Sequence, residues 1–361
     1  MKKSILSGRK YRFINEKSIS GVMLAAETEL KKAQKVKEYL NRHSLVNPDY
    51  LIVKELGLIY FPLNKKVKVP GARVLNTKFD FPKKKKPLEV ENVLRGKLTP
   101  EEQALLPKSQ ETVGSILILE IPPELEPKEK IIAEAYLKSN KALTTIVKKD
   151  EIHSGVYRTR TVKVLAGKNT KETIHTENGV KLKIDLEKTY FSAKSGHERL
   201  RVAEQVKKGE LVLVMFSGAA PYPLVIARNS PAKMVYAVEM NPLAHQLAVQ
   251  NITSNHLEEK IVLYLGDARK VVPKLKKKFD RIAMPLPKTG EEFLDVTLKA
   301  SHKGTIIHLY AFLAEEEIPK DKKRIKALCK NLGYNVKILR AVKCGQFSPR
   351  IFRVCFDMGV E

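Results

Sequence analysis

The chain has 361 residues, of which 43% are hydrophobic and 30% charged, a composition typical of a globular protein with two or three domains. Its 67 Lys and Arg residues outnumber 40 Asp and Glu residues, which gives a formal net charge of +27. No run of about 18 apolar residues occurs, so we expect no membrane span, and the N-terminus lacks the apolar core of a signal peptide. Three cysteines are too few for a disulfide framework, so we expect buried thiols in a reducing cytoplasm.

The basic residues are concentrated between residues 64 and 97, where 11 basic residues accompany 3 acidic ones. This segment contains the run Lys83, Lys84, Lys85 and Lys86. A solvated linker could have this composition, but a surface that binds the phosphate backbone of a nucleic acid explains the concentration of charge better. An anionic membrane is a weaker alternative, because no amphipathic helix with large apolar residues lies beside the run.

The first two segments differ in composition. Residues 1–63 are expected to form a small N-terminal α/β domain, since a helical pattern at 27–43 precedes a strand-like run at 49–63. Residues 64–112 are rich in Pro and Lys and show little periodicity, so we interpret them as a linker with one short helix. Thr99 suits the N-cap of that helix and Pro100 its first position.

Residues 113–195 are expected to form an α+β middle domain. A strand at 115–122 and a helix at 126–139 precede three alternating β runs within 157–192. The spacing of these runs favours a mostly antiparallel sheet.

The pattern changes at residue 196. Apolar runs of 6 to 10 residues now alternate with helix-length stretches, and they lie at 211–216, 233–240, 260–266, 279–287 and 304–313. Such near-continuous apolar strands indicate a parallel sheet covered by helices on both faces. Two more strands, at 335–344 and 350–358, could form a hairpin at the sheet edge. We therefore predict an α/β lobe with seven strands over residues 196–361.

Ligands of an open α/β sheet bind beyond the carboxyl ends of its strands. The first strand ends in a small-residue loop at 216–222, the second at Glu239, the third at Asp267, and the fourth in the rigid turn 285–288 (Pro-Leu-Pro-Lys). An acid at a strand end is more often a helix cap, and Asp267 in particular suits an N-cap. Taken in order, however, the set suits S-adenosylmethionine, with Glu239 at the ribose and Asp267 at the adenine amino group.

A nicotinamide dinucleotide is disfavoured, because the glycine pattern GxGxxG is absent from the first loop. No group of His, Cys and Asp residues has metal-ligand spacing, so we expect no metal. The predicted cofactor-binding residues are Phe216, Ser217, Gly218, Ala219, Pro221, Glu239, Met240, Asp267, Ala268 and Pro285.

Residues 113–361 resemble the archaeal and eukaryotic tRNA (guanine-37-N1)-methyltransferase family, which includes related wyosine-pathway enzymes. The resemblance is carried by collinear stretches that include HSGVYRTRTVKVLAG (153–167), HERLRVA (197–203), FSGAAPYPLVIAR (216–228), YAVEMNP (236–242), GDAR (266–269) and MPLPK (284–288). Residues 1–63 are loosely similar to the family's N-terminal domain, which grips the outer corner of tRNA. The resemblance implies a Rossmann-like class I methyltransferase sheet behind two smaller domains, in a cytoplasmic monomer that binds S-adenosylmethionine and the anticodon loop.

Methyl transfer to a ring nitrogen of guanine requires an acceptor for the N–H proton and a cation for the charge on the neighbouring carbonyl oxygen. The resemblance assigns the first role to Glu198 and the second to Arg158, with Arg160 beside the substrate. Structural alternatives stay open: Glu198 could pair with Arg199 or Arg201 at a helix start, and Arg158 could be a surface residue of a strand.

Pro285 departs from the family pattern, which usually has an asparagine there whose amide contacts the target base. One archaeal subgroup linked to wyosine-type bases has Pro-x-Pro-Lys as this chain does, so we expect the turn to form a rigid wall against the base. The predicted substrate-binding residues are Arg160, Pro285, Leu286, Pro287, Lys288, Lys83, Lys84, Lys85 and Lys86.

The sequence is compatible with three functions. Methylation of N1 of guanine 37 is favoured, because removal of an N–H proton gives Glu198 a role. A wyosine-pathway reaction at the same position, either methylation of a tricyclic guanine derivative or aminocarboxypropyl transfer, would use the same cofactor. A non-catalytic RNA-binding protein with a decayed pocket is disfavoured by the presence of both Glu239 and Asp267.

Overall fold

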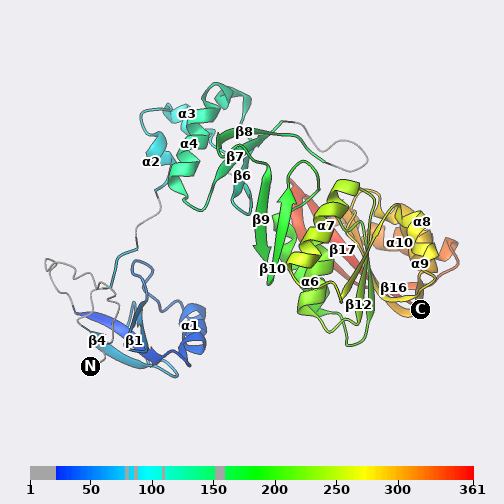
Figure 1. Ribbon diagram of the computed structural model, residues 1–361, viewed down its shortest axis with the longest axis horizontal. Coiled ribbons are helices and arrows are strands. Elements are labelled where there is room, and N and C mark those ends of the chain that lie inside the picture. The colour runs from blue at the N-terminus through cyan, green and yellow to red at the C-terminus, as the bar shows by residue number, and fades with distance from the viewer. Residues whose placement is uncertain (1–21, 78–80, 85–87, 108–109, 151–158) are drawn as a thin grey trace, which may run out of the picture. The chain divides into compact units, whose positions relative to one another are not determined.

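The computed structural model describes residues 22–77, 81–84, 88–107, 110–150 and 159–361 (Figure 1). These residues divide into two compact units, one up to Pro87 and one from Leu88 to Glu361. Within the described residues, no helix is both long enough and apolar enough to cross a membrane.

The first unit is a four-stranded antiparallel sheet with one helix. Its strands are β1 (Met23–Glu29), β2 (Val53–Glu55), β3 (Leu58–Pro62) and β4 (Arg73–Thr77), in the order β2-β3-β1-β4. Helix α1 (Ala33–Arg42) buries Ala33, Val36 and Leu40, which recur at helical spacing and pack in the core of this unit.

Much of the described part of the expected linker at 64–112 is folded. Strand β4 pairs with β1, Phe81 is fully buried, and the backbone of Lys83 forms an isolated bridge with Tyr50. Val67, Val69, Ala72 and Val74 pack in one cluster of the first unit and Phe81 in another, so these apolar side chains show no clear period in the sequence. The first unit therefore extends to Pro87, and residues from Leu88 onward belong to the second unit.

The second unit begins with a small α+β region. Its elements are α2 (Val90–Leu94), α3 (Pro100–Ala104), β5 (Glu111–Val113), β6 (Ile116–Leu119), η1 (Pro123–Lys128), α4 (Glu129–Ser139), β7 (Thr145–Lys149) and β8 (Val162–Gly167). Thr99 and Glu102 form the capping box that starts α3. The sheet order is β5-β6-β7-β8, with β6 and β7 parallel and the other pairs antiparallel, and of the three β runs expected in one sheet only the first, β8, belongs to it.

A separate hairpin of β9 (Glu172–Glu177) and β10 (Val180–Asp185) follows, and it packs against the C-terminal lobe. Two asparagines bind the backbone of this hairpin: Asn251 of α7 (Pro242–Ser254) and Asn255, the C-cap residue of that helix. Asn251 accepts from the Lys183 N–H at 2.7 Å and donates to the Lys183 carbonyl at 3.0 Å, and Asn255 bonds the backbone of Lys181 in the same way. The alternating pattern of 171–192 correctly predicted strands, but their buried face belongs to the C-terminal core, so the expected boundary at 195 lies too late.

The C-terminal lobe contains the predicted seven-stranded sheet, in the order β13-β12-β11-β14-β15-β17-β16. The strands are β11 (Leu211–Met215), β12 (Met234–Glu239), β13 (Ile261–Leu265), β14 (Phe279–Met284), β15 (Ser301–Ala314), β16 (Val336–Ser348) and β17 (Ile351–Val360). The first five are parallel, and β17 is antiparallel to both β15 and β16, which confirms the hairpin at the edge.

Helices cover both faces of this sheet, as Figure 1 shows. One face carries α5 (Gly196–Glu204), α6 (Pro221–Asn229) and α7, and the other carries α8 (Ala268–Lys274), α9 (Leu294–Lys299) and α10 (Ile318–Asn331), with short 3-10 turns at η2 (Ala193–Ser195), η3 (Gly290–Phe293) and η4 (Glu315–Glu317). Strand β15 continues past β14, whose last residue, Met284, pairs with Leu309. Tyr310 and the residues after it therefore stand at the carboxyl edge of the sheet, beside β17.

Candidate active site at the carboxyl edge of the sheet

The loop after β11 has the backbone of a tight ligand-binding turn. Phe216, Gly218 and Ala220 all have positive φ angles, of 57°, 57° and 66°. The Ala220 N–H donates to the Ser217 carbonyl at 3.0 Å, and Pro221 then occupies the first turn of α6. A left-handed alanine is unfavourable by roughly 1 kcal/mol, so the surrounding structure holds this loop in one conformation.

Glu239, the last residue of β12, joins this loop to the next one. Its Oε2 accepts from the Gly218 N–H at 2.6 Å, and its Oε1 accepts from the Asn241 N–H at 2.7 Å. Burial raises the pKa of Glu239, while these N–H groups favour its anionic form. Each carboxylate oxygen keeps a second lone pair, so Glu239 can also accept from ribose hydroxyls.

Asp267 follows the third strand. Its Oδ1 accepts from the Arg269 N–H at 2.8 Å, so Asp267 is the N-cap of α8, as its position in the sequence also predicted. Ala268 is buried beside it. Two apolar side chains, Met240 and Leu265, stay exposed at the ends of β12 and β13. Met240 was predicted from the sequence and Leu265 was not, although an exposed leucine that ends an apolar strand is a signal for a ring-binding surface.

An adenosyl group fits these residues. The hydroxyl oxygen of Ser217 is buried and has no hydrogen-bond partner among the described residues, so this loop contains an unsatisfied polar group. Exposed apolar side chains suit a purine, and Glu239 suits vicinal hydroxyls. This donor and acceptor set belongs to a nucleoside site.

The turn after β14 is tight. The Leu286 N–H donates to the Met284 carbonyl at 2.7 Å, and the Gly290 N–H donates to the Leu286 carbonyl at 2.8 Å. Pro285 and Pro287 fix the chain between these bonds. A pocket of about 140 Å³ opens beside this turn, and it is lined by Pro287, Lys288, Tyr310, Phe312 and Arg324 among others.

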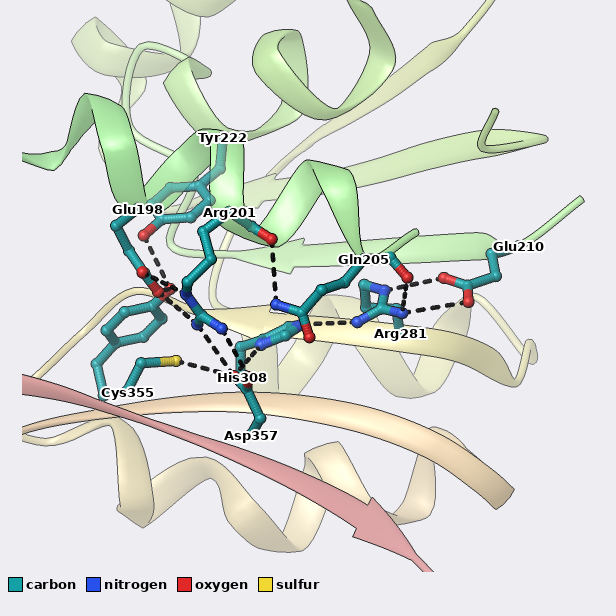
Figure 2. A network of polar contacts seen from close by, with 10 residues as sticks. Glu198, Arg201, Gln205, Glu210, Tyr222, Arg281, His308, Cys355 and Asp357 are labelled. Carbon is teal, nitrogen blue, oxygen red and sulfur yellow. Dashed lines mark hydrogen bonds and ion pairs between the residues drawn. The ribbon is translucent and has the colours of Figure 1, made fainter. Parts of the chain in front are cut away.

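Glu198, on the first turn of α5, is almost fully buried and bound on both oxygens (Figure 2). Arg201 donates from Nε to Glu198 Oε2 at 2.6 Å and from Nη2 to Oε1 at 2.8 Å. The Tyr310 hydroxyl donates to Oε1 at 2.7 Å. Of the two ion pairs considered from the sequence, the one with Arg201 is present. Arg199 instead pairs with Glu177 at 2.5 Å.

The polar network continues across three strands, as Figure 2 shows. Arg201 also donates to both oxygens of Asp357 on β17, and Asp357 Oδ1 lies 2.6 Å from Nδ1 of His308 on β15. His308 Nε2 lies 2.8 Å from Nη1 of Arg281 on β14, which in turn pairs with Glu210. Asp357 was not predicted from the sequence as part of the site, although a charged residue between Phe356 and Met358 signals a buried partner.

Other predicted residues lie elsewhere. Arg158, Lys85 and Lys86 are outside the described residues. Arg160, expected at the substrate, is instead buried, and its Nη1 lies 3.5 Å from Glu111 Oε2 within the α+β region. Lys83 is exposed.

Lys84 is also exposed, and its N–H donates to the Asp49 carbonyl at 2.7 Å. The backbone at the start of the lysine run is therefore fixed on the first unit.

The strand order, the left-handed loop after the first strand and the acid after the second define a class I, S-adenosylmethionine-dependent methyltransferase. Residues 173–337 match the TRM5/TYW2 methyltransferase domain, and residues 90–170 match the TYW2 N-terminal domain. The chain belongs to the TRM5/TYW2 methyltransferase family.

Two relatives represent the activities in this family. The tRNA (guanine(37)-N(1))-methyltransferase Trm5b of Pyrococcus abyssi is 32% identical over 340 residues, which cover 94% of this chain and 99% of the relative. The tRNA(Phe) (4-demethylwyosine(37)-C(7)) aminocarboxypropyltransferase of Pyrococcus horikoshii is 33% identical over 272 residues, or 75% of this chain and 96% of the relative.

Solved structures show the same fold. A complex of aTrm5 with tRNALeu has a TM-score of 0.67 and 27% identity, and it covers 94% of this chain and 100% of that chain. Methanocaldococcus jannaschii Trm5 in complex with adenosine has a TM-score of 0.63 and 28% identity, covering 93% of this chain and 99% of that one.

Proposed function

We propose that this protein transfers the methyl group of S-adenosylmethionine to N1 of guanine 37 in tRNA, next to the anticodon. The observation that supports this most is the position of Glu198. Its carboxylate accepts a hydrogen bond from Tyr310. Leu309 pairs with Met284, the last residue of β14, so Tyr310 and the Glu198 carboxylate lie at the level of the turn that begins at Pro285. A buried carboxylate at that edge suits acceptance of the N1 proton.

The chemistry divides between the cofactor and the chain. When bound, S-adenosylmethionine supplies a methyl group activated by a positively charged sulfur. Glu198 accepts the N1 proton, so that the electron pair of that N–H bond becomes available to form the new N–C bond. Arg158, by the resemblance of its motif, stabilises the charge on O6, and the Pro285–Lys288 turn orients the base by shape.

Binding of tRNA is the coarser part of the proposal, and it is supported by the net charge of +27 and by the tRNA complex of a structural relative. The finer part is that the first unit contacts the outer corner while the methyltransferase lobe contacts the anticodon loop. Lys83 and Lys84 support it, because their backbone is held and their side chains are exposed.

Two features favour a second candidate, a wyosine-pathway activity at the same position. Residues 90–170 match the TYW2 N-terminal domain. Pro285 stands where the pattern of tRNA (guanine-37-N1)-methyltransferases usually has an asparagine. The Trm5b relative nevertheless aligns with 94% of this chain, against 75% for the aminocarboxypropyltransferase, so the first unit has an aligned counterpart in the methyltransferase. We therefore favour methylation of guanine.

Nucleoside mass spectrometry of tRNA tests the proposal. Unmodified tRNA with guanosine at position 37 is incubated with the enzyme and cofactor labelled in the methyl group, and a matched transcript with adenosine 37 serves as the control. The expected product is 1-methylguanosine with the label, from the first transcript only. A product that carries the larger aminocarboxypropyl group, or methyl transfer only to a tricyclic base, would support the wyosine activity instead.

A protein that binds tRNA but neither transfers a group nor binds S-adenosylmethionine in calorimetry would be a non-catalytic RNA-binding protein.

A further inference from the structure

Two buried carboxylates share one guanidinium at the candidate active site. Arg201 Nη2 lies 2.8 Å from Glu198 Oε1 and 3.1 Å from Asp357 Oδ1. The other two contacts, from Nε to Glu198 at 2.6 Å and from Nη1 to Asp357 at 2.7 Å, make both pairs bidentate. Both carboxylate side chains are 2% exposed. Glu198 is thus beside a second negative charge, and both use the same cation.

Asp357 is held in its charged form from the other side by His308. Arg281 can only donate, so its Nη1 makes Nε2 of His308 an acceptor, and the ring proton must lie on Nδ1. Nδ1 therefore donates to Asp357 at 2.6 Å. Burial opposes a charge on Asp357, but the hydrogen bonds from His308 and Arg201 hold the pKa of Asp357 well below its usual range. Burial also lowers the pKa of His308, in agreement with a neutral ring.

The other titratable groups near Glu198 stay uncharged at neutral pH. Tyr222 on α6 donates to the Tyr310 hydroxyl at 2.9 Å, and burial raises the pKa values of both tyrosines. Burial likewise raises the pKa of Cys355 on β17 and brings that of Cys344 on β16 to about 11.

Two further cations lie nearby and have other partners: Arg353 on β17 donates to the Ser195 hydroxyl and to the Cys344 carbonyl, and Arg199 pairs with Glu177. Arg201 is therefore the charged group that is bonded to both Glu198 and Asp357.

We infer that Asp357 is a positioning residue for methyl transfer, which keeps Arg201 in place and makes it easier for Glu198 to accept the N1 proton. This inference rests on the proposed function. With Glu198 ionised, the three groups carry a net charge of −1, and proton uptake brings it to zero. Arg201 is then left with Asp357 as its counterion, so this half-buried cation keeps a charged partner throughout the reaction.

Without Asp357, Glu198 in the same position would be a poor proton acceptor. Glu198 would then be the only anion bonded to Arg201, and each proton it accepted would leave a half-buried guanidinium without a counterion, which is unfavourable. Asp357 does not need to touch the substrate to have this effect. It acts through Arg201, and its influence should appear in the pH dependence of the reaction.

The test is the pH profile of single-turnover methyl transfer by Asp357→Asn. Removal of the second negative charge should move the acid limb of the profile to lower pH by about one unit and lower the plateau rate about tenfold. Glu129→Gln is the matched control, since Glu129 is also a buried carboxylate, paired with Lys148 and Lys163 in the α+β region. It should leave the acid limb unmoved.

Glu198→Gln separates this inference from the proposed function. If Glu198→Gln retains the wild-type rate, the assignment of Glu198 as proton acceptor fails, whatever Asp357→Asn does. If Glu198→Gln is inactive and folded Asp357→Asn keeps the wild-type acid limb, only the role of Asp357 is overturned. Should Asp357→Asn not fold, Asp357→Ser removes the same charge, leaves space for a water molecule and carries the same expectation.

Discussion

The hydroxyl of Tyr310 donates a 2.7 Å hydrogen bond to Glu198, a residue 112 positions earlier in the chain. Tyr310 is fully buried on β15, and its hydroxyl in turn accepts from Tyr222. This bond links the helix that carries the candidate proton acceptor to the sheet edge where the substrate is expected. Tyr310 is thus one of two residues, with Arg201, that donate to this carboxylate.

Tyr310→Phe should therefore move the acid limb of the methyl-transfer profile to higher pH, by about half a unit, since the anion loses one donor. This direction is opposite to that expected for Asp357→Asn. Tyr222→Phe is the control, because it leaves the Tyr310–Glu198 bond in place. An acid limb that moves equally in both variants would show that the hydroxyl pair acts on packing alone. The measurement is the single-turnover rate across pH.

Glu198→Gln should reduce the rate of methyl transfer by about 100-fold or more, since an amide cannot accept the N1 proton. The affinity for tRNA should stay within about twofold, because Glu198 is buried and bound to Arg201 and Tyr310. Rates come from single-turnover assays and affinities from filter binding. Glu177→Gln, which removes the buried carboxylate that pairs with Arg199, the residue after Glu198, is the matched variant. An equal loss of rate in both variants would argue that the fold of α5, and not the chemistry of Glu198, was damaged.

The parallel sheet could be predicted from the sequence, whereas the contacts of Arg201 with Asp357 could not. The parallel sheet was predictable, because strands such as Leu211–Met215 are buried on both faces and therefore read as continuous apolar runs. The ends of those strands followed from the topology. The bond from Arg201 to Asp357 did not, since the two residues are 156 positions apart and only the folded sheet brings β17 under α5.

Domain boundaries were harder for a related reason. The alternation in Val180–Asp185 shows that one face of β10 is buried, but not which body covers it, and the covering helix α7 begins 57 residues after β10 ends. Similarly, strand β4 at Arg73–Thr77 has only Thr77 fully buried, so its pattern among lysines resembles a linker. Local patterns predict element type, whereas boundaries depend on distant partners.

Replacement of Lys83, Lys84, Lys85 and Lys86 by glutamine should weaken tRNA binding and make it less sensitive to salt, because each phosphate contact releases counterions. If all four contact phosphates, the slope of log affinity against log salt concentration should fall by about 3 to 4. Binding is measured from 50 to 300 mM salt. Lys322, Lys323, Lys326 and Lys330 on α10 provide a control with the same charge change. An equal effect of both replacements would indicate that only net charge matters.

His308 should make the folded protein less stable as the pH is lowered below about 6.5, the ordinary pKa of histidine. Burial lowers the pKa of His308 in the folded protein, so the unfolded chain binds a proton there at a pH where the folded chain does not. His308→Asn, which keeps a donor toward Asp357, should unfold more readily at pH 7 but lose stability less steeply between pH 6.5 and pH 5, by up to about 1.4 kcal/mol per pH unit. Urea unfolding at each pH measures both effects, and His197→Asn, at an exposed position of α5, should keep the wild-type slope. An unchanged slope in His308→Asn would mean that His308 is protonated in the folded protein, and the direction of its hydrogen bonds to Asp357 and Arg281 would have to be revised.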